Sequence, residues 1–274
     1  MLMNPIDTLF QQLRREGRKA FIPFVTAGDP DLDATAQAVR ELARRGASLV
    51  EVGFPYSDPI ADGSVIQASY TRALERGIRV EDIFACARRV LADPALAGRV
   101  PLVGMVSFSL VHHRGPERFI TQAQEAGFSG AIVPDLPVEE ADELTRLAAD
   151  RDFKLIQLVT PTTPRERAVR IAKASTGFLY CVSVTGITGT RERLPEELTG
   201  QLAELRRLTD LPLCVGFGIS RPEHVRALRD LADGVIVGSA VVRLVEQAAS
   251  RPLAEVGRAV GDLARALGEA LNPG

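Results

Sequence analysis

The stretch "SLVEVGFPYSDPIADG", residues 48–63, places a carboxylate inside an apolar run. Val50 and Val52 are typical of a strand buried on both faces, and Glu51 lies between them. Because successive side chains of a strand point to opposite faces, Glu51 would face the interior of a barrel while both valines pack against helices. A second acid, Asp62, follows in a loop rich in Pro, Gly and Asp. The stretch therefore predicts a barrel strand that carries one acid and leads into another.

Similar short, β-branched runs recur along the chain and alternate with amphipathic stretches. We count eight runs, at residues 20–25, 48–53, 100–106, 130–135, 154–159, 177–182, 212–217 and 234–239. Eight strand–helix units in 274 residues predict an α/β fold of the (β/α)₈ or TIM-barrel type, with residues 1–274 as one domain. A doubly wound open sheet is the alternative. It is less favoured because eight units would usually divide into two domains, and no linker separates them.

Two helices are expected beyond the eight units. The stretch "NPIDTLFQQLRREG", residues 4–17, precedes the first strand and carries apolar residues at helical spacing. The stretch "VEDIFACARRVLAD", residues 80–93, lies between the second and third strands. Further along, Ser220 is expected to be the N-cap of the helix in "SRPEHVRALRD".

Composition excludes several classes of function. The net charge is −2, so no basic excess suggests nucleic-acid binding. No apolar run reaches the roughly 18 residues that span a bilayer, and the N-terminal residues lack a signal-peptide pattern. The three cysteines are widely spaced and form no CxxC motif, which is typical of a reducing compartment. We therefore expect a cytoplasmic protein that binds neither nucleic acid nor membrane.

Three glycine-rich loops follow the last three predicted strands. They are "GFGIS" at residues 216–220, Gly238-Ser239, and the loop 183–193 that contains Gly186 and Gly189. Glycines let backbone N–H groups approach an anion, and TIM barrels often bind phosphate after strands seven and eight, near a short helix. Each glycine alone would more often only turn the chain. Three such loops at one rim predict a phosphate-bearing ligand.

The two acids are expected to differ in protonation. Apolar walls would raise the pKa of Glu51, which suits a group that exchanges protons near neutral pH. Asp62 is expected nearer water and ionised, so the two carboxyls could take different roles. Two alternatives remain open: Glu51 could be paired with an arginine, and Asp62 could only cap the helix in residues 64–77.

Other motifs are weak. His112, His113 and His224 give no metal-ligand spacing, so no metal site is expected. No GxGxxG motif follows the first strand and no GK[ST] motif occurs, which argues against nucleotide binding.

These segments resemble one family, the tryptophan synthase alpha subunits. The matching stretches occur in the family's order: "FIPFVTAGDPD", "LVEVGFPYSDPIADGSVIQ", "IVPDLPVEE", "YCVSVTGITG", "GFGIS" and "VIVGSA". The resemblance implies retro-aldol cleavage of indole-3-glycerol phosphate to indole and glyceraldehyde 3-phosphate without a cofactor. It also implies an alpha2-beta2 tetramer in which indole passes to a beta subunit that carries pyridoxal phosphate.

The resemblance assigns roles to individual residues. Glu51 would be the catalytic acid and base, and Asp62 would hold the indole nitrogen. Substrate-binding residues would be Phe24, Tyr180, Phe217 and Ile236 at the indole ring, Gly189, Gly218, Gly238 and Ser239 at the phosphate, and Thr188 with Gly189 in a mobile loop. Asp58 and Asp135 would contact the partner or couple the loops.

The sequence departs from the family in two places. Residue 64 is Ser where the family usually has Pro, and residues 106–115 differ from a stretch that lies near the family's partner interface. Two other readings stay open: a phosphate-sugar isomerase or epimerase on the same barrel, and a subunit that mainly activates its partner. The isomerase would need a catalytic Lys, His or metal set, and among the predicted strands only Lys154 stands at a strand start.

Overall fold

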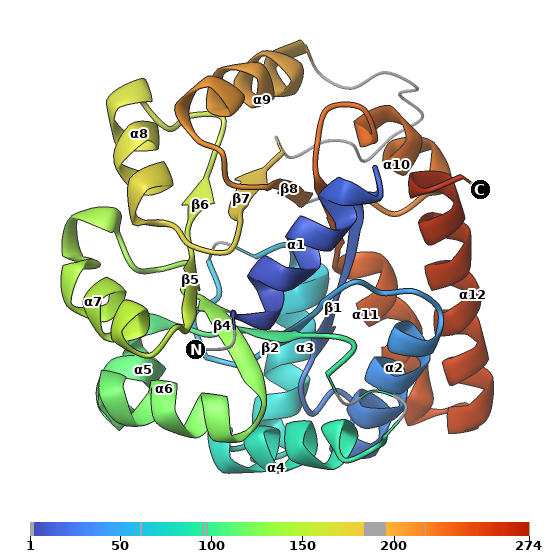
Figure 1. Cartoon of the computed structure of the whole chain (residues 1–274). Coiled ribbons are helices and arrows are strands. Elements are labelled where there is room, and N and C mark those ends of the chain that lie inside the picture. The colour runs from blue at the N-terminus through green and yellow to red at the C-terminus, as the bar shows by residue number, and fades with distance from the viewer. Residues whose placement is uncertain are drawn as a thin grey trace.

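Nine parallel strands form a barrel surrounded by helices (Figure 1). The computed structural model describes residues 3–60, 62–94, 96, 98–183, 196–216 and 218–273. The strands are β1 (Ala20–Thr26), β2 (Val50–Gly53), β3 (Leu102–Met105), β4 (Phe128–Ile132), β5 (Lys154–Ile156), β6 (Leu158–Val159), β7 (Leu179–Val182), β8 (Leu213–Gly216) and β9 (Gly234–Val237). Their order in the sheet is β5-β4-β3-β2-β1-β9-β8-β7-β6. The predicted TIM barrel is confirmed.

The eight predicted runs give nine strands because the run 154–159 is divided at Gln157. β5 pairs with β4 and β6 pairs with β7, so this one run joins the two ends of the sheet. The backbone N–H of Gln157 donates to the hydroxyl of Ser175 at 3.1 Å instead of to a neighbouring strand, while its carbonyl accepts from the N–H of Tyr180. This side-chain contact explains the break, which the run of apolar residues does not predict.

Helices form the outer layer around the barrel (Figure 1). They are α1 (Pro5–Arg15), α2 (Leu32–Arg44), α3 (Ser64–Glu75), α4 (Val80–Leu91), α5 (Phe108–Arg114), α6 (Pro116–Glu125), α7 (Asp142–Asp150), α8 (Arg165–Ala174), α9 (Glu196–Leu208), α10 (Pro222–Leu228), α11 (Ser239–Val245) and α12 (Leu253–Leu271), with 3₁₀ turns at Val138–Glu140 and Glu246–Ala249. The two predicted extra helices are present as α1 and α4. No helix in the described part of the chain combines the length and apolarity that a membrane crossing requires.

One predicted helix cap is wrong. Helix α10 begins at Pro222, and its N-cap is Arg221 rather than Ser220. Proline is favoured at the first helical position because its fixed φ suits the helix and its missing N–H is not needed there. The position of Pro222 therefore sets the start of this helix.

Helix α1 lies across one end of the barrel (Figure 1). Its buried residues Ile6, Phe10 and Leu13 join the apolar cluster that fills the barrel interior. The Phe10 ring packs against Phe178 with centroids 5.7 Å apart. Because α1 covers this end, a ligand would have to enter at the carboxyl ends of the strands, where TIM barrels hold their sites.

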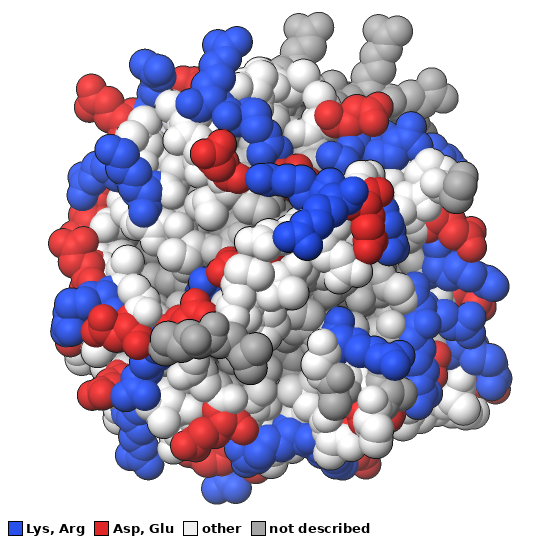
Figure 2. All heavy atoms as spheres, in the orientation of Figure 1, with Lys and Arg blue, Asp and Glu red and all other residues white. Residues whose placement is uncertain are grey.

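The predicted alternation of β2 is confirmed. Leu49 belongs to the interior cluster, while Val50 and Val52 belong to the cluster between the strands and the helices. Glu51 shares the interior face with Leu49 and is 1% exposed. On the outer surface, basic and acidic side chains are interspersed around the face shown in Figure 2, in keeping with the net charge of −2.

Candidate active site

A cavity of about 340 Å³ lies at the carboxyl ends of the strands. Its walls come from β1, β2, β3, β7 and β9 and from the starts of α3 and α11. The lining residues are Phe24, Glu51, Asp62, Gly63, Ser64, Val65, Ile66, Met105, Tyr180, Gly218, Ile219, Ser220, Ile236, Gly238, Ser239, Ala240 and Arg243. The cavity is thus apolar in its middle, with two acids on one side and small polar groups at its rim.

Glu51 stands in the middle of β2, opposite Phe24 of β1. Neither of its carboxyl oxygens has a hydrogen-bond partner among the described residues. Burial and, to a smaller extent, the negative charge of Asp62 together raise the pKa of Glu51 to about 8. Glu51 is therefore mostly protonated at neutral pH and can donate a proton into the cavity. The alternative of a pairing arginine is not found in the described structure.

Asp62 lies in the loop before α3, and its environment differs from the one expected from the sequence. It is buried, at 8% exposure, rather than near water. Its pKa is raised to about 6, because burial raises the pKa more than the hydrogen bond from the Tyr56 hydroxyl, which donates to Asp62 Oδ2 at 3.4 Å, lowers it. The carboxyl remains mostly ionised at neutral pH. Asp62 does not cap α3, since the N-cap is Gly63 and no side chain accepts a capping hydrogen bond.

The apolar part of the cavity is bounded by Phe24, Tyr180, Ile236 and Met105. Gly53 of β2 makes room for this wall: a side chain there would overlap the Phe24 ring and would approach the hydroxyl of Tyr70 to 2.6 Å. Apolar walls of this kind suit a planar aromatic ligand. They also keep water from Glu51, which is the physical cause of its raised pKa.

The rim combines backbone groups with small polar side chains. Gly218 has a φ of +75°, a backbone conformation that residues with a side chain rarely adopt. Gly238 precedes Ser239, the first residue of α11, and Ser220 lies between Gly218 and α10. Arg243 follows Ser239 by one helical turn. The rim offers N–H groups, hydroxyls and a guanidinium, which together can bind an anion.

Eight of the eleven predicted site residues line this cavity: Phe24, Glu51, Asp62, Tyr180, Gly218, Ile236, Gly238 and Ser239. Thr188, Gly189 and Phe217 lie outside the described residues, as does most of the loop 183–193. Asp58 and Asp135 do not line the cavity; Asp58 accepts from the hydroxyl of Ser57, and Asp135 accepts from the N–H of Phe108 at 2.7 Å.

Sequence reasoning missed several lining residues. Met105 was hidden in an apolar run that reads as core, and Ile66 lies on the cavity side of α3. The sequence could have predicted Arg243 at the site, because it stands four residues after Ser239 and therefore lies on the same face of a helix. Among the described residues, no group of three His, Cys, Asp or Glu side chains could hold a metal ion.

Comparison with known proteins identifies the family. A model of the family "Tryptophan synthase alpha chain" matches residues 10–268. The tryptophan synthase alpha chain of Rhodopirellula baltica is 47% identical over 277 residues, covering 98% of this chain and 99% of that protein. The tryptophan synthase alpha chain of Synechococcus elongatus is 49% identical over 247 residues, covering 89% and 91%.

This chain belongs to the tryptophan synthase alpha chain family.

Solved structures agree with this membership. The chain is similar to the crystal structure of tryptophan synthase subunit alpha from Legionella pneumophila, with a TM-score of 0.88, 34% identity and coverage of 99% of both chains. It is also similar to a chain of the tryptophan synthase complex from Pyrococcus furiosus, whose title describes mutual activation of an a2b2 complex. That match has a TM-score of 0.83 and 34% identity, and covers 91% of this chain and 98% of the other. As a member of the tryptophan synthase alpha family, the chain is a carbon–carbon lyase.

Proposed function

We propose that this cavity cleaves indole-3-glycerol phosphate to indole and glyceraldehyde 3-phosphate by a retro-aldol reaction. The observation that carries the proposal is the position of Glu51, a protonated acid in an apolar cavity whose rim can bind an anion. The indole ring would lie between Phe24, Tyr180 and Ile236. The phosphate would lie at the rim formed by Gly218, Gly238 and Ser239, so binding at both ends positions the bond to be broken.

The two acids account for the proton transfers. Glu51, with a pKa of about 8, would donate its proton to indole C3 and leave positive charge on the ring near its nitrogen. The ionised Asp62 would accept a hydrogen bond from the ring N–H and so stabilise that positive charge. As the carbon–carbon bond breaks, its electron pair returns to the ring. Glu51 would then take the proton of the hydroxyl that becomes the aldehyde, and so return to its starting state.

We propose that the reaction needs no cofactor. Every step above is a proton transfer or a bond cleavage driven by protonation, and the two carboxyl groups supply both. Pyridoxal phosphate would be needed only by the beta subunit. We further propose that the whole chain acts as one barrel domain in the cytoplasm, where the intermediates of amino-acid biosynthesis occur.

We propose that the product indole passes to a beta subunit in an alpha2-beta2 tetramer. The relative from P. furiosus is part of such a complex by its title. On this chain the loop after β2 lies at the same end of the barrel as the cavity, which supports docking of a beta subunit there. In this loop Ile60, two residues after Asp58, is 90% exposed, although isoleucine is among the residues most often buried.

Release of indole from indole-3-glycerol phosphate tests the proposal. The isolated chain should release indole, and added beta subunit should increase the rate. A chain that mainly activates its partner would release none under either condition, and an isomerase would consume the substrate without forming indole. Either of those results would contradict the proposed reaction.

A further inference from the structure

Arg243 is the one basic residue among the described residues that line the cavity. It lies on α11, one turn after Ser239, and its side chain is exposed at the rim. Its backbone carbonyl accepts from the side chain of Gln247 at 3.2 Å. Its guanidinium has no carboxylate within ion-pair distance in the part of the chain that the structure describes. The cation is therefore available to a ligand.

A neighbouring contact explains why the Arg243 guanidinium has no carboxylate partner among the described residues. Glu246 stands three residues further along, a spacing that commonly forms an ion pair on a helix. Instead Glu246 accepts from Arg72 of α3 at 2.9 Å. Arg72 also donates two hydrogen bonds to the buried carboxylate of Asp29, at 2.9 and 2.7 Å. Arg72 thus binds both Asp29 and Glu246, so Glu246 does not pair with Arg243.

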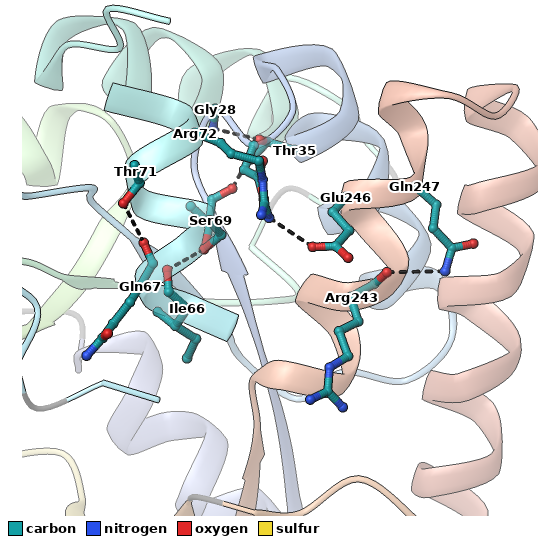
Figure 3. Close-up of polar contacts among 12 residues, drawn as sticks. Gly28, Thr35, Ile66, Gln67, Ser69, Thr71, Arg72, Arg243, Glu246 and Gln247 are labelled. Atoms are coloured by element: carbon teal, nitrogen blue, oxygen red, sulfur yellow. Dashed lines mark hydrogen bonds and ion pairs between the residues drawn. The ribbon is translucent and has the colours of Figure 1, made fainter. Parts of the chain in front are cut away.

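Figure 3 shows this arrangement. Arg72 reaches from α3 to Glu246, while the Arg243 side chain extends away from that pair. The separation leaves the cavity with opposite charges on different walls, since its carboxyl groups belong to β2 and to the loop before α3. Phe24 of β1 lies between them, because it pairs with Glu51 on one side and Pro23 beside it pairs with Val237 of β9 on the other.

We propose that Arg243 binds the phosphate of the substrate directly and thereby sets the orientation of the substrate in the cavity. This inference rests on the proposed function, because it names the cation that the phosphate of indole-3-glycerol phosphate would meet. Backbone N–H groups and the Ser239 hydroxyl can bind phosphate oxygens but bring no full positive charge. A guanidinium at the same rim supplies that charge and can donate two hydrogen bonds. The ionised carboxylate of Asp62, which lines another wall of the cavity, repels the phosphate.

The test measures binding without turnover. Binding of glycerol 3-phosphate is determined by calorimetry for the wild-type chain, Arg243→Gln, Arg243→Met and Arg243→Lys, alongside Arg258→Gln as a control. Arg258 is an exposed arginine of α12 outside the cavity, so its replacement changes the net charge equally. We expect the Gln and Met variants to bind roughly 10-fold more weakly, and the Lys variant to lose less, because it keeps the charge but not the paired donors.

Binding of indole separates a direct contact from a structural role. Indole has no phosphate, so its affinity should be the same in wild type and in every Arg243 variant. Raising the salt concentration should weaken glycerol 3-phosphate binding more in wild type than in Arg243→Gln. The inference is overturned if the Gln and Met variants stay within about twofold of wild type, if Arg258→Gln loses as much, if indole binding falls in parallel, or if wild type does not bind glycerol 3-phosphate.

The outcomes also distinguish this inference from the proposed reaction. Selective loss of glycerol 3-phosphate binding without indole release by wild type would support Arg243 and reject the lyase assignment. Indole release by wild type with unchanged kinetics and binding in Arg243→Gln would support the lyase and reject the role of Arg243.

Discussion

At the scale of single residues, the chemistry depends on two acids whose pKa values differ. Burial raises both, but Tyr56 donates to Asp62 while Glu51 has no such partner among the described residues. The sequence predicted the burial of Glu51, because strand alternation is local. It did not predict the burial of Asp62, because that depends on how the loop packs against α3 and Tyr56. The order of the two pKa values nevertheless agrees with the expectation.

The pH dependence of kcat/KM should follow from these values. Glu51 must be protonated to donate, so activity should fall above pH about 8, and Asp62 must be ionised, so it should fall below pH about 6. Tyr56→Phe removes a hydrogen bond to the ionised carboxylate and should raise the pKa of Asp62. The acid limb should therefore move to higher pH while the alkaline limb stays. An unchanged acid limb in this variant would contradict the role of Tyr56.

Replacing Glu51 should make the fold more stable. The folded-state pKa of about 8 lies above the ordinary 4.5, so folding becomes less favourable as pH rises from about 4.5 to about 8. Glu51→Gln removes that cost, so the free energy of unfolding should rise by on the order of 4 kcal/mol at pH 8 and by little at pH 4.5. Urea denaturation at both pH values measures this. A variant less stable than wild type at pH 8 would show that the carboxyl is not destabilising.

At the scale of elements, α3 and α11 both border the cavity, and Arg72 of α3 pairs with Glu246, the C-cap of α11. The sequence predicts α3 and most strands, since apolar spacing and caps are local signals. It does not predict the division of the fifth run at Gln157, which depends on Ser175. It also does not predict that Arg72 engages Glu246, 174 residues away, and so leaves Arg243 available. Contacts between distant segments are the part of the site that sequence patterns do not contain.

Arg72→Met should destabilise the chain. Asp29 has a side chain only 1% exposed, and without Arg72 its carboxylate would lose two hydrogen bonds. The expected loss is about 2 kcal/mol in the free energy of unfolding. The control Arg79→Met removes an exposed pair with Asp82 and should cost less than about 0.5 kcal/mol. If both variants lose the same free energy of unfolding, the buried Arg72–Asp29 pair stabilises the fold no more than an exposed pair does.

At the scale of the whole molecule, the barrel is closed at one end and open at the other. Helix α1 covers the amino ends of the strands, and the cavity and the exposed Ile60 lie beyond their carboxyl ends. A partner that receives indole would therefore dock at the open end. The (β/α)₈ architecture could be predicted from the spacing of the strands. For the docking surface, the sequence indicates only the loop after β2 and not the other residues that a partner would contact.

Ile60→Asp should weaken the response to a beta subunit. A charge on an exposed apolar contact would disfavour docking but would leave the cavity unchanged. The isolated variant should release indole at the wild-type rate, and added beta subunit should stimulate it less. Met3→Asp, placed just before α1 at the closed end, should respond like wild type. If Ile60→Asp is stimulated fully, the loop after β2 does not make an essential contact.

Release of indole from indole-3-glycerol phosphate by Glu51→Gln, compared with wild type at pH 7, tests the central claim most directly. The glutamine fits the same space but cannot donate and recover a proton. We expect turnover to fall at least roughly 10²-fold while the substrate still binds. Indole release at the wild-type rate would contradict the assignment of Glu51 as the proton donor.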